Sequence, residues 1–403
     1  MASWLAGCDG ASTESTDLRP APAHVRERDV EIPAARDDGS IPLAVTVLDD
    51  EVGFLLSVRT GTPTALLSIA RIVSPSGRIL HTESGPIDDP SVDSLIASIG
   101  WAGEGELALF LPNAPVVGAM PGTWRIDIVH EDGEPLADAH LITVRRSAHD
   151  RERRLDLAIM DASGAGVAEY AQGATPRAAR RARSARAVQH AAMDEVLAPH
   201  ALGIGRIDVL PRAPRRLRGT LSMDGGSEAD LCREAVRAAD PWSLPVVIVD
   251  GFSGDGDEAE ELIGWAPVPG VLREPDSAGS CVFVGSHRDV EDDDERQAAF
   301  AMTLLHEAGH FMGLEHVSEF DGRLFDRLDD TRECHIGDVD GRDDERFDVA
   351  GEIDGVIDDF ECGRAGGADN LMFWSGVPEF APFRLSDQQA DVLRAHPLFH
   401  PLE

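Results

Sequence analysis

The sequence of 403 residues contains no lysine, so all 36 of its basic residues are arginines, against 73 aspartates and glutamates. Its formal net charge is −37 at pH 7. Such a chain repels the phosphate backbone of nucleic acids, so we expect no nucleic-acid partner. It also lacks any run of about 18 apolar residues, the length that a membrane-spanning helix needs. No transmembrane helix is therefore predicted.

Cysteine is scarce, and no two cysteines form a C-x-x-C pair, so a structural zinc cluster is not indicated. Cys8 stands apart from the other four and ends the sequence Leu-Ala-Gly-Cys. This sequence resembles the lipobox of bacterial lipoproteins, in which the cysteine carries the lipid. The residues before it are too few for a signal peptide, so either the true start lies upstream or the match is accidental. We expect an exported protein of the bacterial cell envelope, secreted or anchored to the membrane through a lipid on Cys8.

The strongest motif begins at His306 and reads H-E-x-x-H-x-x-G-x-x-H. His306 and His310 are one helical turn apart, so both imidazoles leave the same face of a helix. Gly313 lets the chain turn at positive φ, which can bring His316 back as a third ligand. Three neutral imidazoles with one open position are typical of a catalytic zinc site. Glu307 is the candidate general base, and a degenerate site without activity is the alternative.

Composition divides the chain into three parts. Residues 1–40 are polar and lack apolar periodicity, which predicts a truncated lipoprotein signal and a flexible linker. Residues 41–147 contain short apolar runs separated by glycine and proline turns, which predict an all-β sandwich of immunoglobulin-like or pre-peptidase-like type. Residues 148–403 alternate strand and helix patterns, which predict an α/β domain with a mixed twisted sheet. The helix that carries the first two histidines is expected at 296–312.

The zinc motif, the preceding α/β order and a downstream Asn-Leu-Met at 370–372 resemble the metzincin metalloproteases, and among them the pappalysin-like group. In that clan a methionine lies on a tight turn beneath the metal, and Met372 matches it. The resemblance covers residues 155–403 and implies Zn²⁺ on the three histidines with Glu307 as the base. No tyrosine follows Met372, because the only tyrosine is Tyr170. Clan members that use such a tyrosine are therefore poor models for this chain.

The pappalysin-like pattern also includes an insertion between Cys334 and Cys362. That pair is the first candidate disulfide, and Cys232 with Cys281 is the second. Four cysteines permit three pairings, and free buried thiols are the alternative.

The insertion is densely acidic, and pappalysin-like relatives bind calcium in the corresponding region. Its aspartates have a spacing like that of a calcium loop without the full EF-hand pattern. The candidate Ca²⁺ ligands are Asp326, Asp329, Thr331, Asp338, Asp340 and Asp343. A solvated acidic loop is the alternative.

Together these features predict a zinc-dependent endopeptidase that acts on peptides or proteins. The strand expected at 280–285 is interpreted as an edge strand to which an extended substrate adds. Two alternatives stay open. One is a catalytically silent binding or adhesion lipoprotein of the envelope, and the other is a zinc hydrolase acting on a non-protein amide. Oligomeric state does not follow from the sequence.

Overall fold

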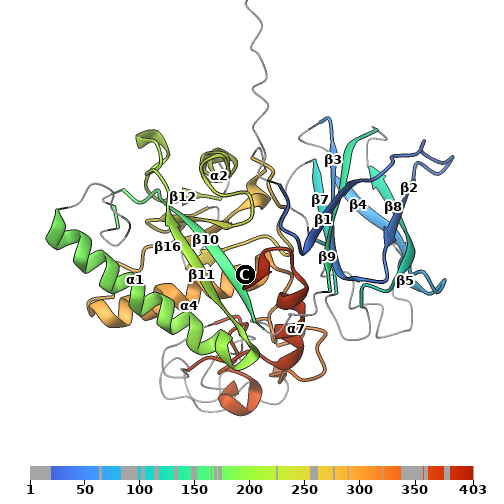
Figure 1. Cartoon of the computed structure of the whole chain (residues 1–403). Helices are drawn as coiled ribbons and strands as arrows, with labels where there is room; N and C mark the ends of the chain where they lie inside the picture. Colours follow the sequence, from blue (N-terminus) through green and yellow to red (C-terminus); the bar gives the residue numbers. More distant parts are fainter. Residues whose placement is uncertain are drawn as a thin grey trace, which may run out of the picture.

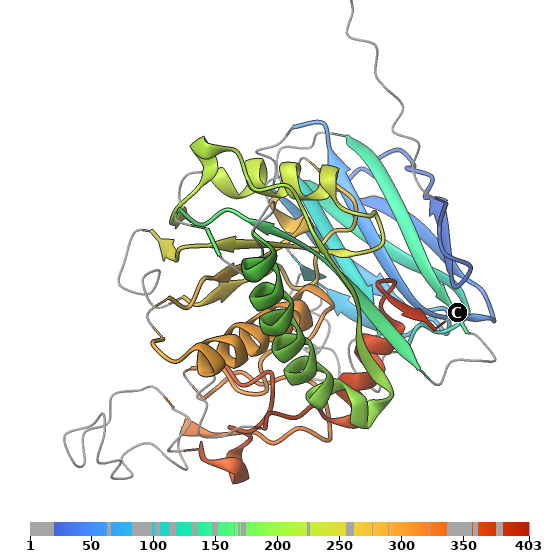
Figure 2. The same ribbon diagram turned by 60° about the vertical axis from the view of Figure 1, so that its left-hand side comes forward.

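The computed structural model describes residues 20–62, 66–82, 99–100, 105–112, 118–130, 135–146, 152–164, 166–167, 170, 175–223, 226–254, 262–275, 277–288, 290–320, 322–336, 357, 362–375 and 382–402. A β-sandwich lies beside a mixed α/β unit (Figures 1 and 2). Within these residues no helix combines the length and apolarity needed to cross a membrane.

The sandwich consists of two sheets whose described strands pair antiparallel. The first has the order β1 (Val25–Asp29), β9 (Leu136–Arg145), β3 (Glu51–Thr60), β7 (Glu106–Leu111) and β6 (Ile99–Gly100). The second has the order β2 (Ile41–Val47), β8 (Gly122–His130), β4 (Leu67–Val73) and β5 (Ile79–Thr82). Each predicted apolar run between the turns thus forms a strand.

The sandwich core lies between the two sheets, where alternate residues of each strand point inward. Phe54 of β3 meets Trp124 of β8 edge to face, with ring centroids 5.6 Å apart. The neighbouring Leu55 points to the opposite face and belongs to the core of the α/β unit. Strand β7 alternates in the same way between Leu109 and Phe110. The first sheet is therefore buried on both faces.

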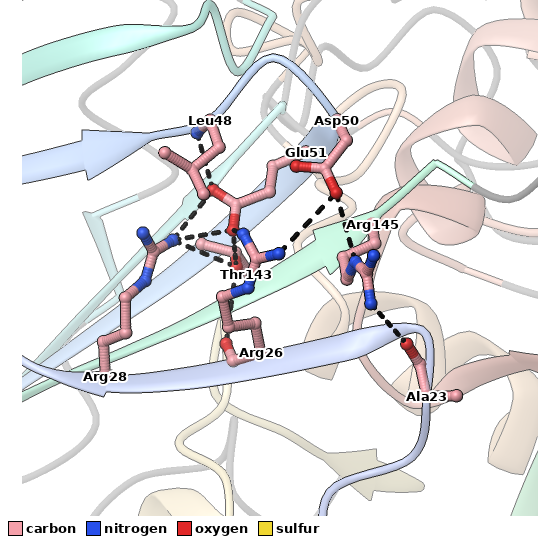
Figure 3. A network of polar contacts seen from close by, with 8 residues as sticks. All are labelled: Ala23, Arg26, Arg28, Leu48, Asp50, Glu51, Thr143 and Arg145. Atoms are coloured by element: carbon pink, nitrogen blue, oxygen red, sulfur yellow. Dashed lines mark hydrogen bonds and ion pairs between the residues drawn. The ribbon is translucent and has the colours of Figure 1, made fainter.

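Strand β1 shows that the linker prediction for residues 1–40 is wrong at Val25–Asp29, which pair with β9. Its sequence, Val-Arg-Glu-Arg-Asp, does not alternate apolar and polar residues, so hydrophobicity gave no sign of a strand. Ion pairs help to hold it in the sheet. Arg26 and Arg28 donate to the buried Glu51 of β3, which also accepts from the hydroxyl of Thr143 (Figure 3). Cys8 lies outside the described residues.

The α/β unit is built on a six-stranded mixed sheet. Its order is β11 (Leu202–Val209), β10 (Arg153–Asp161), β13 (Leu244–Val249), β16 (Val282–Gly285) and β15 (Gly264–Trp265), with β17 (Phe399–Pro401) also on β10. A small parallel pair joins β12 (Leu221–Ser222) to β14 (Phe252–Ser253). The α-helices are α1 (Pro176–Leu197), α2 (Ser227–Ala238), α4 (Asp293–Phe311) and α7 (Asp387–Ala395). Short 3₁₀ helices are η3 (Ala198–His200), η4 (Arg215–Leu217), η5 (Ala278–Ser280) and η6 (Arg364–Gly366).

This sheet is the middle of three layers. Every residue of β13 is buried, as the unbroken apolar sequence predicts for a strand covered on both faces. Val246 and Ile248 pack into the core that includes α1 and α4, whereas Val247 and Val249 pack into the core that includes α2. The α/β plan expected from the sequence is present.

Two details of the α/β unit differ from the prediction made from the sequence. Strand β16 is internal, between β13 and β15, so the edge strand predicted at 280–285 is wrong, and among the described strands β15 forms the edge. Strand β15 has only two residues, too few to show the alternation of apolar and polar residues that predicts a strand, so the sequence analysis did not predict it. Helix α4 begins at Asp293 instead of 296, because the Asp292 side chain accepts from the N–H groups of Asp294 and Glu295.

Candidate metal centre and active site

Helix α4 and the turn after it bring the three motif histidines together. His306 and His310 lie on the last two turns of α4. Gly313 then has a φ of +93° and donates its N–H to the His310 carbonyl, 2.8 Å away, which ends the helix. This left-handed residue reverses the chain so that His316 faces the other two.

Each imidazole is oriented through its Nδ1 atom. That of His306 lies 2.7 Å from the Leu371 carbonyl, and that of His310 lies 2.8 Å from the Leu314 carbonyl. Nδ1 of His316 lies 2.9 Å from a carboxylate oxygen of Glu319. Because these oxygens only accept, Nδ1 donates in each case and Nε2 carries the lone pair.

The three Nε2 atoms converge on one point. Nε2 of His316 lies 3.2 Å from that of His306 and 3.0 Å from that of His310. Zn–N bonds of about 2.0–2.1 Å in a tetrahedron place nitrogens about 3.3 Å apart, so the spacing fits zinc. Three lone pairs facing one another repel unless a cation lies between them. Among the described residues, this triad is the only group of three or more candidate ligands close enough to share one ion.

Burial also favours the neutral form of His306 and His310. Burial, and after it the charge on His316, lower the pKa of His306 to about 3. Burial and the charges on His316 and His306 lower the pKa of His310 well below its usual range. The neutral form is the one that binds a metal ion.

Glu307 lies beside this centre and packs against the edge strand. It is only 6% exposed, and burial raises the pKa of its carboxyl to about 8. A Cβ on Gly264 of β15 would lie 2.4 Å from its Oε1 atom. Only glycine at position 264 therefore leaves room for the carboxylate, which stands between the zinc helix and the edge of the sheet. A cation on the neighbouring imidazoles would favour its ionised form.

Met372 lies beneath helix α4. A Cβ on Gly309 would lie 2.6 Å from its sulfur, so the helix approaches the methionine closely at a residue without a side chain. The Met372 N–H donates to the Asn370 side chain, 2.8 Å away. The Asn370 amide pairs with that of Gln389 at 3.0 and 3.1 Å. Gln389 also forms a capping box with Ser386, so the turn is tied to the start of α7.

Sequence reasoning assigned no role at the site to Glu319 or to Gly264, although the Gly-Trp-Ala segment that begins at Gly264 is part of the resemblance to pappalysin-like proteases. Glu319 follows the third histidine by three residues, a local signal that could have suggested a carboxylate that orients this histidine. Gly264 precedes the motif by more than forty residues, and nothing in its neighbourhood indicates contact with Glu307.

The structure joins Cys334 to Cys362 and Cys232 to Cys281, the two pairings that the sequence analysis ranked first. The Cys334–Cys362 bridge packs against Gly366, a few residues before the methionine turn. It therefore closes the insertion close to the segment that carries Met372.

The candidate calcium ligands are only partly brought together. Asp326 is buried and accepts from the Thr331 hydroxyl, whereas Asp329 is exposed. Burial raises the pKa of Asp326 to about 7. Asp338, Asp340 and Asp343 lie outside the described residues.

Comparisons with known proteins give one informative match. No curated protein matches the chain. A family two carbohydrate esterase from Cellvibrio japonicus is 10% identical, with 70% of this chain and 94% of that one covered and a TM-score of 0.14. The GH26-CBM35 beta-(1,4)-mannanase of Podospora anserina is 11% identical, with 76% and 68% covered and a TM-score of 0.17. Scores this low support no conclusion about fold or function. Residues 244–377 match the family model Peptidase M43, described as pregnancy-associated plasma protein-A, and this match supports a zinc-dependent peptidase.

Proposed function

We propose that the chain is a metzincin-type zinc endopeptidase, with Zn²⁺ held by His306, His310 and His316 and with Glu307 as the general base. The observation that carries the proposal is the convergence of three Nε2 atoms, 3.0 and 3.2 Å apart, beside the buried carboxylate of Glu307. The family match covers all four residues and supports the proposal independently.

The chain's own residues supply the proton transfers. When bound, zinc polarises the substrate carbonyl and makes water more acidic. Glu307 takes the proton from the attacking water and gives it to the leaving nitrogen, so one carboxylate acts first as base and then as acid.

Strand β15 is the proposed substrate platform. Among the described strands it pairs only with β16, so its other side is available for an extended peptide. Gly264 of this strand packs against Glu307. A peptide added there would therefore run past the general base, which favours a peptide or protein substrate.

The test is a peptide-library digest with the wild type, Glu307→Ala and a matched control, Asp294→Ala, at the exposed first turn of the same helix. We expect Glu307→Ala to bind zinc but lose several orders of magnitude in cleavage rate, with the control unchanged. Undiminished cleavage by Glu307→Ala contradicts the assignment. Zinc binding without any peptide cleavage by the wild type favours a silent binding protein or a hydrolase of another amide.

Calcium is a second, separate proposal. Its support is the acidic insertion and the buried Oδ2 atom of Asp326, which has no hydrogen-bond partner among the described residues. Calcium added to chelated, dialysed protein should raise the midpoint of thermal unfolding. An unchanged midpoint contradicts a structural calcium site.

Export to the cell envelope, with lipid on Cys8 as the anchor, is also a proposal. Two disulfides support it, because they persist in oxidising compartments. Intact-mass measurement of protein from membrane and secreted fractions tests it. An unmodified Cys8 in every fraction contradicts the anchor.

A further inference from the structure

The sandwich and the α/β unit share one hydrophobic core. Leu55, Ala108, Phe110 and Ile142 lie on the outer face of the first sandwich sheet and belong to the same buried cluster as the zinc helix. This double burial explains why β3 and β7 contain the near-continuous apolar sequences Phe-Leu-Leu and Leu-Ala-Leu-Phe-Leu. A freely moving accessory domain would not bury both faces of its sheet.

Phe110 reaches the turn of the metal centre directly. It is fully buried, and its Cδ1 atom lies 2.8 Å from the point that a Cβ on Gly313 would occupy. Its ring also meets His396 edge to face at 5.1 Å between centroids. His396 in turn contacts the ring of Phe311, the last residue of α4. A sandwich side chain thus packs against the Gly313 turn and, through His396, against the end of the zinc helix.

The same turn orients two of the histidines. The Leu314 carbonyl, one residue after Gly313, accepts the Nδ1 proton of His310 at 2.8 Å. The Leu314 N–H donates to the Gly309 carbonyl at 2.9 Å, and His316 follows two residues later. A displacement of Gly313 would therefore move the Leu314 carbonyl that orients His310. It would also move the backbone that leads to His316.

We propose that Phe110 is a positioning residue for the zinc site, which makes the β-sandwich a structural part of the metal centre. Its ring fills the space above Gly313 and keeps the turn where His310 and His316 share one ion. The inference relies on the zinc site of the proposed function but not on peptide hydrolysis. Loss of the ring leaves a void into which the turn can relax.

The matched control is Phe54, which is equally buried on the neighbouring strand but faces the sandwich core. The full-length chain is compared as wild type, Phe110→Ala, Phe110→Leu and Phe54→Ala. Zinc affinity is measured by competition with a chromophoric chelator, unfolding by urea titration, and kcat and KM at saturating zinc. Mutation of groups that hold metal ligands in place lowers metal affinity by about 10–100-fold, and we expect a loss in that range for Phe110→Ala.

We expect Phe110→Leu, which retains most of the bulk, to bind zinc within about threefold of the wild type. Phe54→Ala should lower the unfolding midpoint as much as Phe110→Ala while leaving zinc affinity unchanged. Wild-type affinity in Phe110→Ala, or an equal loss in Phe54→Ala, overturns the proposal. If Phe110→Ala does not fold, Phe110→Val is compared with Phe54→Val: a loss of zinc affinity is expected in Phe110→Val alone, and equal zinc affinities in the two variants overturn the proposal. Failure of the proposed function would appear separately, as zinc binding by the wild type without peptide cleavage.

Discussion

The Nδ1 atom of His306 lies 2.7 Å from the backbone carbonyl of Leu371, a residue 65 positions further along the chain. The methionine turn thus orients the first histidine through its backbone, while the Met372 side chain packs under Gly309. In the sequence, the acidic insertion separates the zinc motif from the methionine turn. The Cys334–Cys362 bridge closes that insertion close to the turn.

Because a backbone carbonyl orients His306, the sulfur of Met372 should be replaceable by a side chain of similar volume. We expect Met372→Leu to cost less than about 1.5 kcal/mol of unfolding free energy and to leave zinc affinity within about threefold. Urea unfolding and chelator competition measure the two quantities. A tenfold or larger loss of zinc affinity would mean that the methionine side chain itself shapes the site.

Glu319 should act through His316. Its carboxylate accepts from Nδ1 at 2.9 Å, which fixes the ring and keeps the Nε2 lone pair toward the other histidines. Glu319→Ala is expected to lower zinc affinity by about 10–100-fold, and Glu319→Gln, which keeps an acceptor, by less. Glu333→Ala is the control, because Glu333 is exposed in the same loop and pairs only with exposed His335 among the contacts found. Equal affinities for Glu319→Ala and the wild type contradict this role.

A methyl group at position 264 should impair catalysis without removing the metal. It would lie 2.4 Å from Oε1 of Glu307, so the carboxylate or strand β15 must shift. We expect Gly264→Ala to lower kcat by at least about tenfold, because small displacements of a catalytic group are costly. Gly251→Ala is the control, since a Cβ there meets nothing within 4 Å. Unchanged kcat in Gly264→Ala, measured with zinc content, would contradict the proposed role of this contact.

The local features of the site could be predicted from the sequence, and the distant ones could not. His306 and His310 occupy one helix face, and Gly313 ends that helix, so spacing alone indicates their arrangement. Phe110 and Gly264 contact the site only through tertiary packing. No local pattern indicates that either residue contacts the site, and β15 is too short for a periodic signal.

The same distinction explains the strands of the sandwich. Strands β2 and β8 alternate between buried and more exposed residues and are readily predicted, whereas β1 has a charged residue at every position after the buried Val25. Its place in the sheet depends on Glu51, more than twenty residues away. A pattern of hydrophobicity cannot reveal a strand that is held by a buried ion pair.

That ion pair makes the stability of the sandwich depend on pH. Burial of Glu51 by itself would raise the pKa of its carboxyl, but hydrogen bonds from Thr143, the Leu48 N–H and Arg28 outweigh it and lower that pKa (Figure 3). A carboxyl with a lowered folded pKa stabilises the fold above its unfolded value of about 4.3. The stabilisation is lost as the pH falls through the folded pKa.

We therefore expect Glu51→Gln to cost about 2 kcal/mol of unfolding free energy at pH 7, the size of hydrogen bonds to a charged group. The difference from the wild type should shrink below about pH 4, where the wild-type carboxyl becomes protonated and resembles the amide. Urea titrations between pH 3.5 and 7 measure it. Asp37→Asn, at an exposed site of the same sandwich, should change stability by less than about 0.5 kcal/mol at each pH. A Glu51→Gln difference that stays constant over the whole range would show that ionisation of Glu51 does not stabilise β1.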